Sequence, residues 1–258
     1  MIEHATPGII ACLLIVSLVI YRCLRAGTSY VRRLPAVDAV YEAVGRSAEL
    51  GRPVSFSTGL SSVGPVLYAA MGILHAIAQA CARYRTKLFI PQNDPPAMAI
   101  VESVTRDAYR SVGLSSQFDP RNIVFLSEEQ FAFASGYMGL IHRERVGAAF
   151  LFGAFAGESL ILAEAGQQVG AMQVAASVSP EQVAFFIATC DYTLIGEELF
   201  AASAYLSDDP IQRGSVRAQD LIKVGVFFLI VIGVVCASLQ AVFPSFTFSP
   251  SFLFTGGW

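Results

Sequence analysis

Small polar and acidic side chains follow the apolar segments of this 258-residue chain, and they are its candidate site residues: Ser57, Thr58, Asn93, Asp94, Glu128, Glu158, Ser159 and Asp191. Carboxylates in otherwise apolar surroundings can act as general acids and bases or hold a hard cation. The same residue types also cap helices, because their oxygens accept hydrogen bonds from the first helical N–H groups. A ligand pocket and a set of helix caps are therefore both open interpretations.

Recognised catalytic motifs are absent from the sequence. It contains no GxGxxG, Walker A, GxSxG or HExxH pattern. The segment TGLSSVG at 58–64 offers backbone N–H groups at a helix start, which could hold an anion, but it lacks the phosphate-binding lysine. The pattern predicts no cofactor, and an enzymatic activity is the less favoured interpretation.

The cysteines and histidines indicate neither a disulfide framework nor a metal centre. Five cysteines are widely spaced and form no CxxC pair, and the chain has three histidines. We expect reduced, buried thiols and no metal. Cys190 beside Asp191 could serve as a nucleophile next to an acid, but no positioned base is evident.

The elements that must position these side chains alternate between short β-rich runs and helical segments. The β-rich runs are residues 53–57, 87–90, 123–126, 146–154, 169–177 and 183–190, and the helical segments are 65–84, 97–112, 129–143, 160–165 and 194–206. This alternation predicts an α/β fold, a Rossmann-like mostly parallel sheet with helices on both faces, tethered by two transmembrane helices. Ligands of such sheets bind at the carboxyl ends of the strands, where the candidate residues are expected.

The last two β-rich runs are separated by a connection too short for a helical crossover, which predicts an antiparallel hairpin. A competing signal is Ser179 followed by Pro180, a pair typical of a helix start. We favour the strand because the run VAFFI at 183–187 is β-branched and aromatic.

Two apolar runs predict membrane spans. Residues 221–243 contain Lys223 as their only charge, and residues 8–24 form a second run whose arginines follow it, as in an uncleaved anchor. The tails before the first run and after the second contain no Lys or Arg. Since cytoplasmic flanks carry the excess of basic residues, we expect a multi-pass protein of the cytoplasmic membrane with both termini extracytoplasmic and the main domain cytoplasmic.

The expected domain organisation has five parts. They are an N-terminal transmembrane anchor (1–25), a juxtamembrane helix (26–51), a cytoplasmic α/β domain (52–212), a C-terminal transmembrane helix (213–243) and an extracytoplasmic aromatic tail (244–258). In the juxtamembrane helix, Val37, Val40 and Val44 recur at helical spacing. That helix can pack on the domain or lie on the lipid surface.

The segments GRPVSFSTG, FLSEEQFAFASGYMGLIHRER and CDYTLIGEELFAASAYLSDDP, followed by a terminal apolar run, resemble a prokaryotic membrane-anchored family described as a domain of unknown function. The resemblance runs from about residue 34 to about residue 235. It implies a membrane-tethered cytoplasmic domain, and it supplies neither an activity nor catalytic residues.

The predicted function is a membrane scaffold or assembly subunit, because apolar, alanine- and glycine-rich helices are abundant while catalytic motifs are missing. The expected partners are the lipid bilayer and either further copies of the chain or other membrane-protein subunits. The net charge of −3 argues against nucleic acid. The alternative is a membrane-tethered enzyme or small-ligand sensor that uses a pocket at the carboxyl ends of the strands.

Overall fold

The computed structural model describes residues 16–22, 35–206 and 210–242. The chain forms two compact units: Arg32–Asp208, which holds the α/β domain, and Met1–Val31 with Asp209–Trp258.

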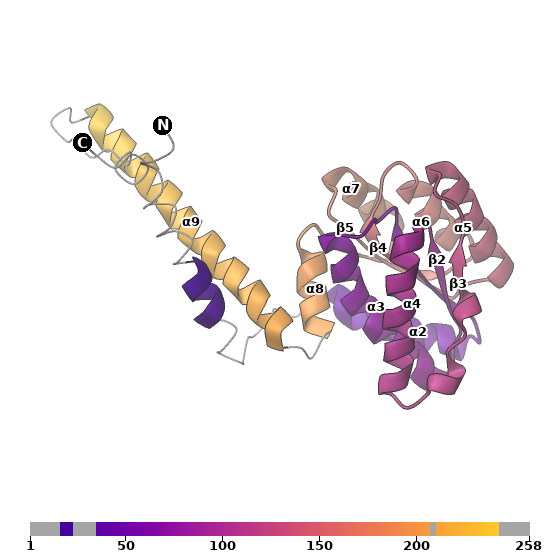
Figure 1. Cartoon of the computed structure of the whole chain (residues 1–258). Helices are drawn as coiled ribbons and strands as arrows, with labels where there is room; N and C mark the ends of the chain where they lie inside the picture. Colours follow the sequence, from indigo (N-terminus) through magenta and orange to yellow (C-terminus); the bar gives the residue numbers. More distant parts are fainter. Residues whose placement is uncertain (1–15, 23–34, 207–209, 243–258) are drawn as a thin grey trace. The chain divides into compact units, whose positions relative to one another are not determined.

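A six-stranded parallel sheet forms the centre of the α/β domain, with the order β3-β2-β1-β4-β5-β6. The strands are β1 (Val54–Gly59), β2 (Leu88–Gln92), β3 (Ile123–Phe125), β4 (Ala148–Ala154), β5 (Met172–Ser177) and β6 (Tyr192–Ile195). Every residue of β1, β2 and β5 is buried, as expected for strands covered on both faces. The predicted Rossmann-like fold is therefore confirmed (Figure 1).

One face of the sheet is covered by α2 (Pro35–Glu49), α3 (Pro65–Tyr84), α4 (Pro95–Ser111) and α8 (Glu198–Leu206), which share one hydrophobic core with it. In this core, Phe56 of β1 stacks on Phe152 of β4 at a ring-centroid distance of 6.0 Å. Helix α2, the expected juxtamembrane helix, buries Val37, Val40 and Val44. It therefore packs on the domain.

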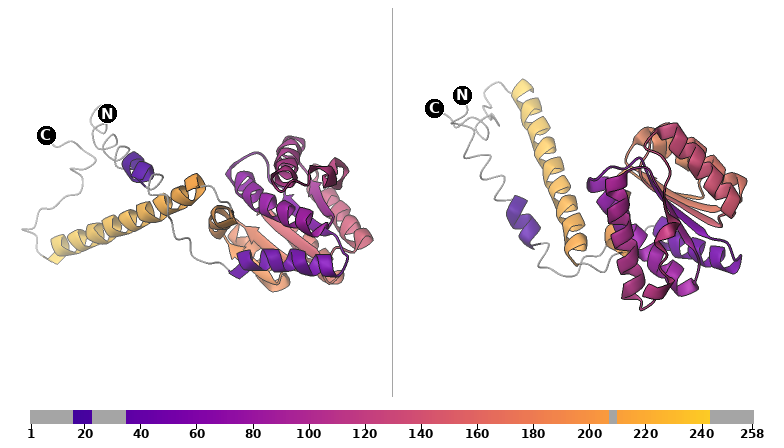
Figure 2. Two further views of the ribbon diagram at one scale, coloured as in Figure 1. Left: turned by 90° about the horizontal axis from the view of Figure 1, so that it is seen from below. Right: turned by 45° about the vertical axis from the view of Figure 1, so that its right-hand side comes forward.

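The other face is covered by α5 (Gln130–Glu144), α6 (Ser159–Gln168) and α7 (Pro180–Thr189). These helices form a second core with strand residues such as Leu151 and Ala175, which alternate with the residues that face the first core. Figure 2 shows the sheet between the two helix layers. Two short 3-10 helices, η1 (Ser115–Gln117) and η2 (Pro120–Asn122), connect α4 to β3.

The predicted sixth strand and its antiparallel hairpin are wrong. Residues 183–190 lie mostly in α7, and β6 follows at Tyr192 and pairs parallel with β5. Ser179 is the N-cap and Pro180 the first residue of the helix. Val183 and Phe186 are buried three residues apart, whereas Phe185 and Ile187 are exposed. This helical spacing puts one face of α7 on the core, so the capping signal prevails over the β propensity of the side chains.

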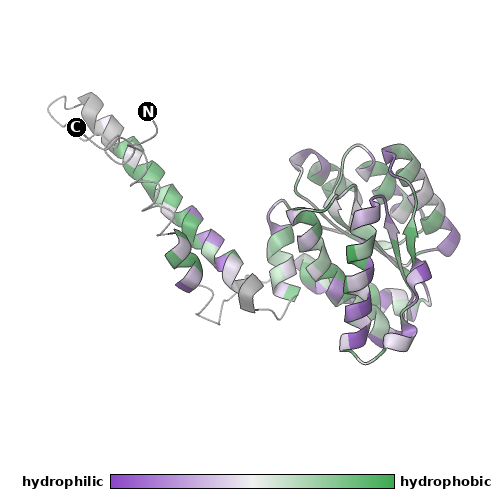
Figure 3. Cartoon of the chain, in the orientation of Figure 1, coloured by the Kyte–Doolittle hydropathy of each residue, from purple (hydrophilic) through white to green (hydrophobic). Residues whose placement is uncertain are grey.

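In the other unit, α9 (Pro210–Val242) is the long helix that contains most of the predicted C-terminal span. Its segment Gly214–Val235 is 6% buried and has a mean hydropathy of 2.1, which is enough in length and composition to cross a membrane (Figure 3). Helix α3 passes the same test, but it is 67% buried and lies in the core of the α/β domain.

The membrane prediction is thus supported for the C-terminal helix. Of the predicted N-terminal span 8–24, the structure describes residues 16–22, which are helical. The predicted aromatic tail 244–258 lies outside the described residues.

Candidate functional site

Six of the eight predicted site residues lie at or just after the carboxyl ends of β1, β2 and β4, and a seventh, Glu128, follows β3. The strand order reverses direction between β1 and β4, because the connections from these two strands lead to helices on opposite faces. Open α/β sheets commonly bind their ligands in the crevice at this point. A ligand site is therefore expected between the loops that follow β1 and β4.

Hydrogen bonds join the two loops that border this position. The Leu60 N–H donates to the Ala154 carbonyl at 2.8 Å. The Ser61 hydroxyl donates to the Thr58 carbonyl at 2.6 Å and accepts from the Ala154 N–H at 2.7 Å. These contacts continue the pairing of β1 and β4 past the end of the strands, so the two loops lie directly against each other.

Two glycines permit this close approach. Gly59 has a φ of +61°, in the left-handed region that favours glycine, and a Cβ there would overlap the Ala154 carbonyl. A Cβ on Gly153 of β4 would overlap the Thr58 carbonyl. The backbones of the two strand ends are therefore in direct contact, with no room for a side chain at either glycine.

The β1 side chains of the predicted pocket are fully buried and hydrogen-bonded within the domain. Ser57 Oγ accepts a hydrogen bond from the Gly59 N–H at 3.1 Å. The Thr58 hydroxyl donates to Gln92 Oε1 of β2 at 3.1 Å. Both hydroxyls therefore fix the strand ends and do not face solvent.

Glu158 and Ser159 have the same structural role at the start of α6. The fully buried Glu158 carboxylate accepts from the Ala156 N–H at 3.0 and 3.1 Å and from Gln130 Nε2 at 2.7 Å. The Ser159 hydroxyl donates to Gln182 Oε1 at 2.5 Å. Glu158 thus ties the β4–α6 turn to α5, and Ser159 ties α6 to α7.

The glutamines that complete these bonds were not predicted as site residues. Gln130 and Gln182 lie in the first turns of α5 and α7, and Gln92 ends β2. Their positions after β-rich runs were the available signal, but which partner each would meet depends on the strand order.

Asn93, Asp94 and Glu128 make fewer contacts. Asn93 is 8% exposed, and its Oδ1 has no hydrogen-bond partner in the described part of the chain. Asp94 is the N-cap of α4 without a side-chain hydrogen bond to that helix, and Glu128 is exposed.

The predicted position of Asp191 is wrong. Because residues 183–190 lie mostly in a helix, Asp191 precedes β6 and lies at the amino-terminal edge of the sheet, where its carboxylate accepts from the Gln173 N–H at 2.7 Å. The structure therefore groups the other predicted residues at one edge and separates Asp191 from them.

The two cysteines of the α/β domain are poor nucleophiles. Burial raises the pKa of the Cys190 thiol to about 12, and burial also raises the pKa of Cys81. Both thiols therefore remain protonated at neutral pH, whereas thiol chemistry requires the thiolate. Across the described ranges, His, Cys, Asp and Glu side chains form no group of three that could hold a metal ion.

Comparison with known proteins places the chain in a family. No curated protein and no solved structure matches it significantly. One family model matches residues 3–248, nearly the whole chain, and its description is "Domain of unknown function (DUF6754)". The resemblance inferred from the sequence is thereby confirmed: the chain belongs to the DUF6754 family.

Proposed function

We propose that the protein is a membrane-anchored, non-enzymatic assembly subunit whose α/β domain binds further copies of the chain or other membrane-protein subunits. One observation carries this proposal. At the carboxyl edge of the sheet, hydrogen bonds hold the loops after β1 and β4 against each other, and the edge presents apolar side chains to solvent. An edge of this kind is suited to binding a protein surface and poorly suited to enclosing a substrate.

The exposed apolar residues of this edge, which we call the carboxyl-edge rim, are Val63, Phe125, Phe131, Leu160, Val178 and Ile195. Their exposed fractions range from 37% for Val178 to 64% for Phe131. They belong to five strand-end segments, those of β1, β3, β4, β5 and β6. Large apolar side chains grouped on a surface are typical of interaction sites.

The charges around the rim favour a protein partner over an anionic lipid surface. Asp94, Glu128, Glu129, Glu181 and Glu197 lie in or next to the loops of this edge. The loops 60–64, 93–94, 126–129, 155–158, 178–179 and 196–197 contain no Lys or Arg. An acidic, apolar surface repels anionic phospholipid headgroups and complements a basic partner surface.

Membrane attachment is assigned to the apolar segment of α9. The arginines that flank the apolar runs support a cytoplasmic domain with both termini on the outer side. The domain would then meet its partners at the inner surface of the membrane.

The test is the native mass of the full chain, extracted from its membranes in mild detergent, with co-purifying proteins identified by mass spectrometry. The rim variant combines Phe131→Ser and Ile195→Ser. The matched control combines Leu50→Ser and Tyr84→Ser, whose side chains are 53% and 55% exposed and lie outside the rim.

We expect the wild type and the control to elute as an assembly, and the rim variant to lose its partners. A wild type that is strictly monomeric and retains no partner would overturn the proposal. Equal loss of assembly in the rim variant and the control would show that the rim is not the contact surface.

The alternative, an enzyme or sensor at the strand ends, is favoured by one observation, the buried Asn93 Oδ1 that lacks a partner among the described residues. If a ligand binds there, Asn93→Ala abolishes its binding while assembly and stability persist. If Asn93→Ala changes stability alone, the residue is structural.

A further inference from the structure

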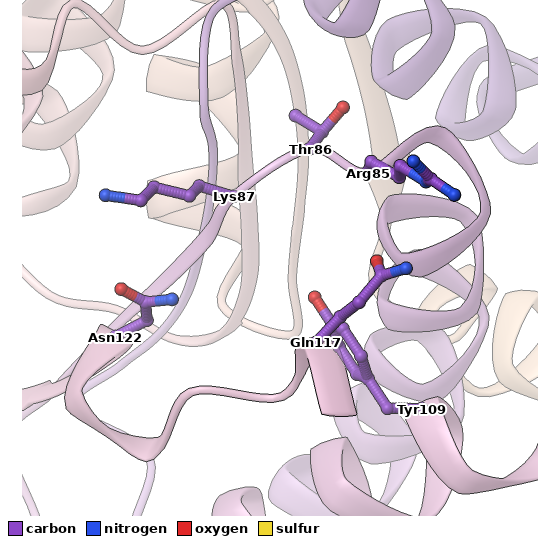
Figure 4. Close-up of a pocket in the computed structure, with 6 residues that line it drawn as sticks. All are labelled: Arg85, Thr86, Lys87, Tyr109, Gln117 and Asn122. Carbon is purple, nitrogen blue, oxygen red and sulfur yellow. The ribbon is translucent and has the colours of Figure 1, made fainter. Parts of the chain in front are cut away.

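A polar pocket lies at the opposite, amino-terminal edge of the α/β domain. It has a volume of about 380 Å³ and is lined by Arg85, Thr86, Lys87, Tyr109, Gln117 and Asn122 (Figure 4). Pockets of a few hundred Å³ are large enough for a small organic ligand. None of these six residues was among the predicted site residues.

The end of α3 builds one wall of the pocket. Arg85 adopts a left-handed conformation, with φ +54°, and its N–H donates to the Ala82 carbonyl at 3.2 Å. The Thr86 N–H then donates to the Cys81 carbonyl at 2.9 Å, which closes a helix-terminating turn. This turn places three polar residues in succession, Arg85, Thr86 and Lys87, immediately before β2.

The connection between α4 and β3 builds the other wall. Its two short helices, η1 and η2, end at Gln117 and Asn122. Tyr109 of α4 is 6% exposed, and its ring packs against Phe118 at a centroid distance of 5.9 Å. The aromatic pair thus packs the connection against α4. Gln117 and Asn122 of this connection line the pocket.

The pocket is lined by two cations, Arg85 and Lys87, that form no ion pair with any described residue. The Lys87 ammonium group lies over the Phe89 ring, 5.8 Å from its centroid. The nearby Asp119 carboxylate is held by Arg121, whose Nε and Nη2 donate to it at 2.9 to 3.2 Å. Lys87 acts on Asp119 only weakly, as the least of the causes that lower the pKa of that carboxyl.

The remaining lining groups are hydrogen-bonding groups without charge. They are the amides of Gln117 and Asn122 and the hydroxyls of Thr86 and Tyr109. In Figure 4, Lys87 and Asn122 lie on the left and Arg85 and Gln117 on the right, and the charged ends of Lys87 and Arg85 lie far apart in this view. A ligand that satisfies both sides needs anionic groups together with several hydroxyl or ether oxygens.

Cations near helix ends are common, because Lys and Arg stabilise the negative end of the helix dipole. Arg83 and Arg110 lie in the last turns of α3 and α4 and fit that explanation alone. Arg85 and Lys87 differ from them, since they line a cavity together with amide and hydroxyl groups. The guanidinium group of Arg and the ammonium group of Lys are also common phosphate-binding groups in proteins.

We propose that this pocket binds a phosphorylated polyol, with Arg85 and Lys87 contacting its phosphate groups and Gln117 and Asn122 contacting its hydroxyl groups. The ligand is either a soluble sugar or inositol phosphate or the phosphorylated headgroup of a membrane lipid. The site is separate from the carboxyl-edge rim, so this proposal does not rest on the assembly function.

The test is binding to the full chain in mild detergent. Isothermal titration with myo-inositol trisphosphate and with inorganic phosphate reports soluble ligands. Native mass spectrometry with added phosphatidylinositol bisphosphate reports binding of a lipid headgroup. Phosphatidylcholine serves as the neutral reference lipid. The two measurements distinguish a soluble ligand from a lipid.

The variants are Arg85→Gly, which removes the charge and suits the left-handed backbone, and Lys87→Gln. The matched controls are Arg83→Gln and Arg110→Gln, two exposed cations of the same region that do not line the pocket. We expect each pocket variant to weaken binding about tenfold or more, and each control to change it less than about twofold.

Binding of inositol trisphosphate that the pocket variants weaken, without retention of the phosphoinositide, supports a soluble ligand. Selective retention of the phosphoinositide that the pocket variants weaken supports a lipid headgroup. The proposal is overturned if neither compound binds at millimolar concentration. It is also overturned if the controls weaken binding as much as the pocket variants, since the attraction would then be a general effect of the basic edge.

Discussion

The close contact between the ends of β1 and β4 requires a glycine at position 153. A Cβ at this position would overlap the Thr58 carbonyl and lie 2.6 Å from Ser61 Oγ, and neither group can move without breaking the bonds that join the two loops. Gly139 of α5 provides a matched contrast, because a Cβ there would meet no atom within 4 Å. The two glycines thus separate the effect of crowding from that of removing a glycine.

We predict that Gly153→Ala lowers the free energy of unfolding by about 2–3 kcal/mol, as overpacking of a core does. Gly139→Ala should be neutral or stabilising by up to about 1 kcal/mol, since alanine favours a helix interior. Urea unfolding of the full chain, followed by circular dichroism, measures both. Equal effects of the two substitutions would mean that the strand ends are not in close contact.

The reactivity of the buried Cys190 thiol should depend strongly on pH. Burial raises its pKa to about 12, so the thiolate, which is the reactive form, is nearly absent at pH 8 and forms only as the pH approaches 12. In a variant whose other cysteines are replaced by serine, we expect iodoacetamide to alkylate Cys190 at least about 100-fold more slowly at pH 8 than an ordinary thiol.

The reference thiol for that measurement is Ser116→Cys, placed on an exposed residue of η1. The rates of the two thiols should converge as the pH rises. If Cys190 reacts as fast as the reference at pH 8, the thiol is accessible and ionised, and the nucleophile that the sequence suggested would have to be reconsidered.

At the scale of elements, the sequence was sufficient where a segment had one dominant signal. The runs that became β1 to β5 are short, rich in apolar residues and bounded by turn residues, so pattern and length identified them as strands. Residues 183–190 had two conflicting signals, β-branched and aromatic side chains within the run and a helix start before it. The structure follows the helix start, because one helical face suffices to bury Val183 and Phe186.

The same reasoning explains what could be predicted of the candidate site. Polar residues after parallel strands must share one edge of the sheet, which correctly grouped Ser57, Asn93 and Glu158. Closure of that edge depends on a contact between Gly59 and Ala154, residues far apart in the sequence. Their adjacency follows from the strand order, which local patterns do not encode.

The apolar segment of helix α9 is expected to insert into the membrane. Ile230 lies near the middle of the predicted span 221–243 and is 56% exposed. We predict that Ile230→Arg prevents α9 from crossing the membrane, because a central arginine opposes insertion by about 2.5–3.5 kcal/mol. Gln219→Arg, a control that lies just before this span, should be tolerated.

The measurement is the side of the membrane on which the C-terminal tail lies, read by labelling Ser251→Cys with a membrane-impermeant maleimide in a background free of other cysteines. The tail should change sides in Ile230→Arg and keep its side in Gln219→Arg. An unchanged tail in both variants would show that α9 does not require an apolar centre, which is inconsistent with a membrane span.

At the scale of the whole molecule, the two edges of the α/β domain differ in chemistry. The carboxyl edge is acidic and apolar, whereas the amino edge carries the polar pocket with Arg85 and Lys87. Residues 146–206 contain no Lys or Arg, so the cations of the domain precede β4. Variants at one edge should therefore leave the proposed role of the other edge intact, and the two proposals can fail independently.

The basic residues beside the two apolar runs predict the orientation of the chain in the membrane. The apolar runs are flanked on their inner sides by Arg22, Arg25, Arg213 and Arg217, while the outer tails contain no Lys or Arg. Basic residues close to a span resist translocation, so both termini should be extracytoplasmic. In right-side-out vesicles, an impermeant maleimide should label Glu3→Cys and Ser251→Cys at once and Ser116→Cys only after detergent is added. Immediate labelling of Ser116→Cys would reverse the orientation, and protection of Glu3→Cys alone would mean that only the C-terminal helix spans the membrane.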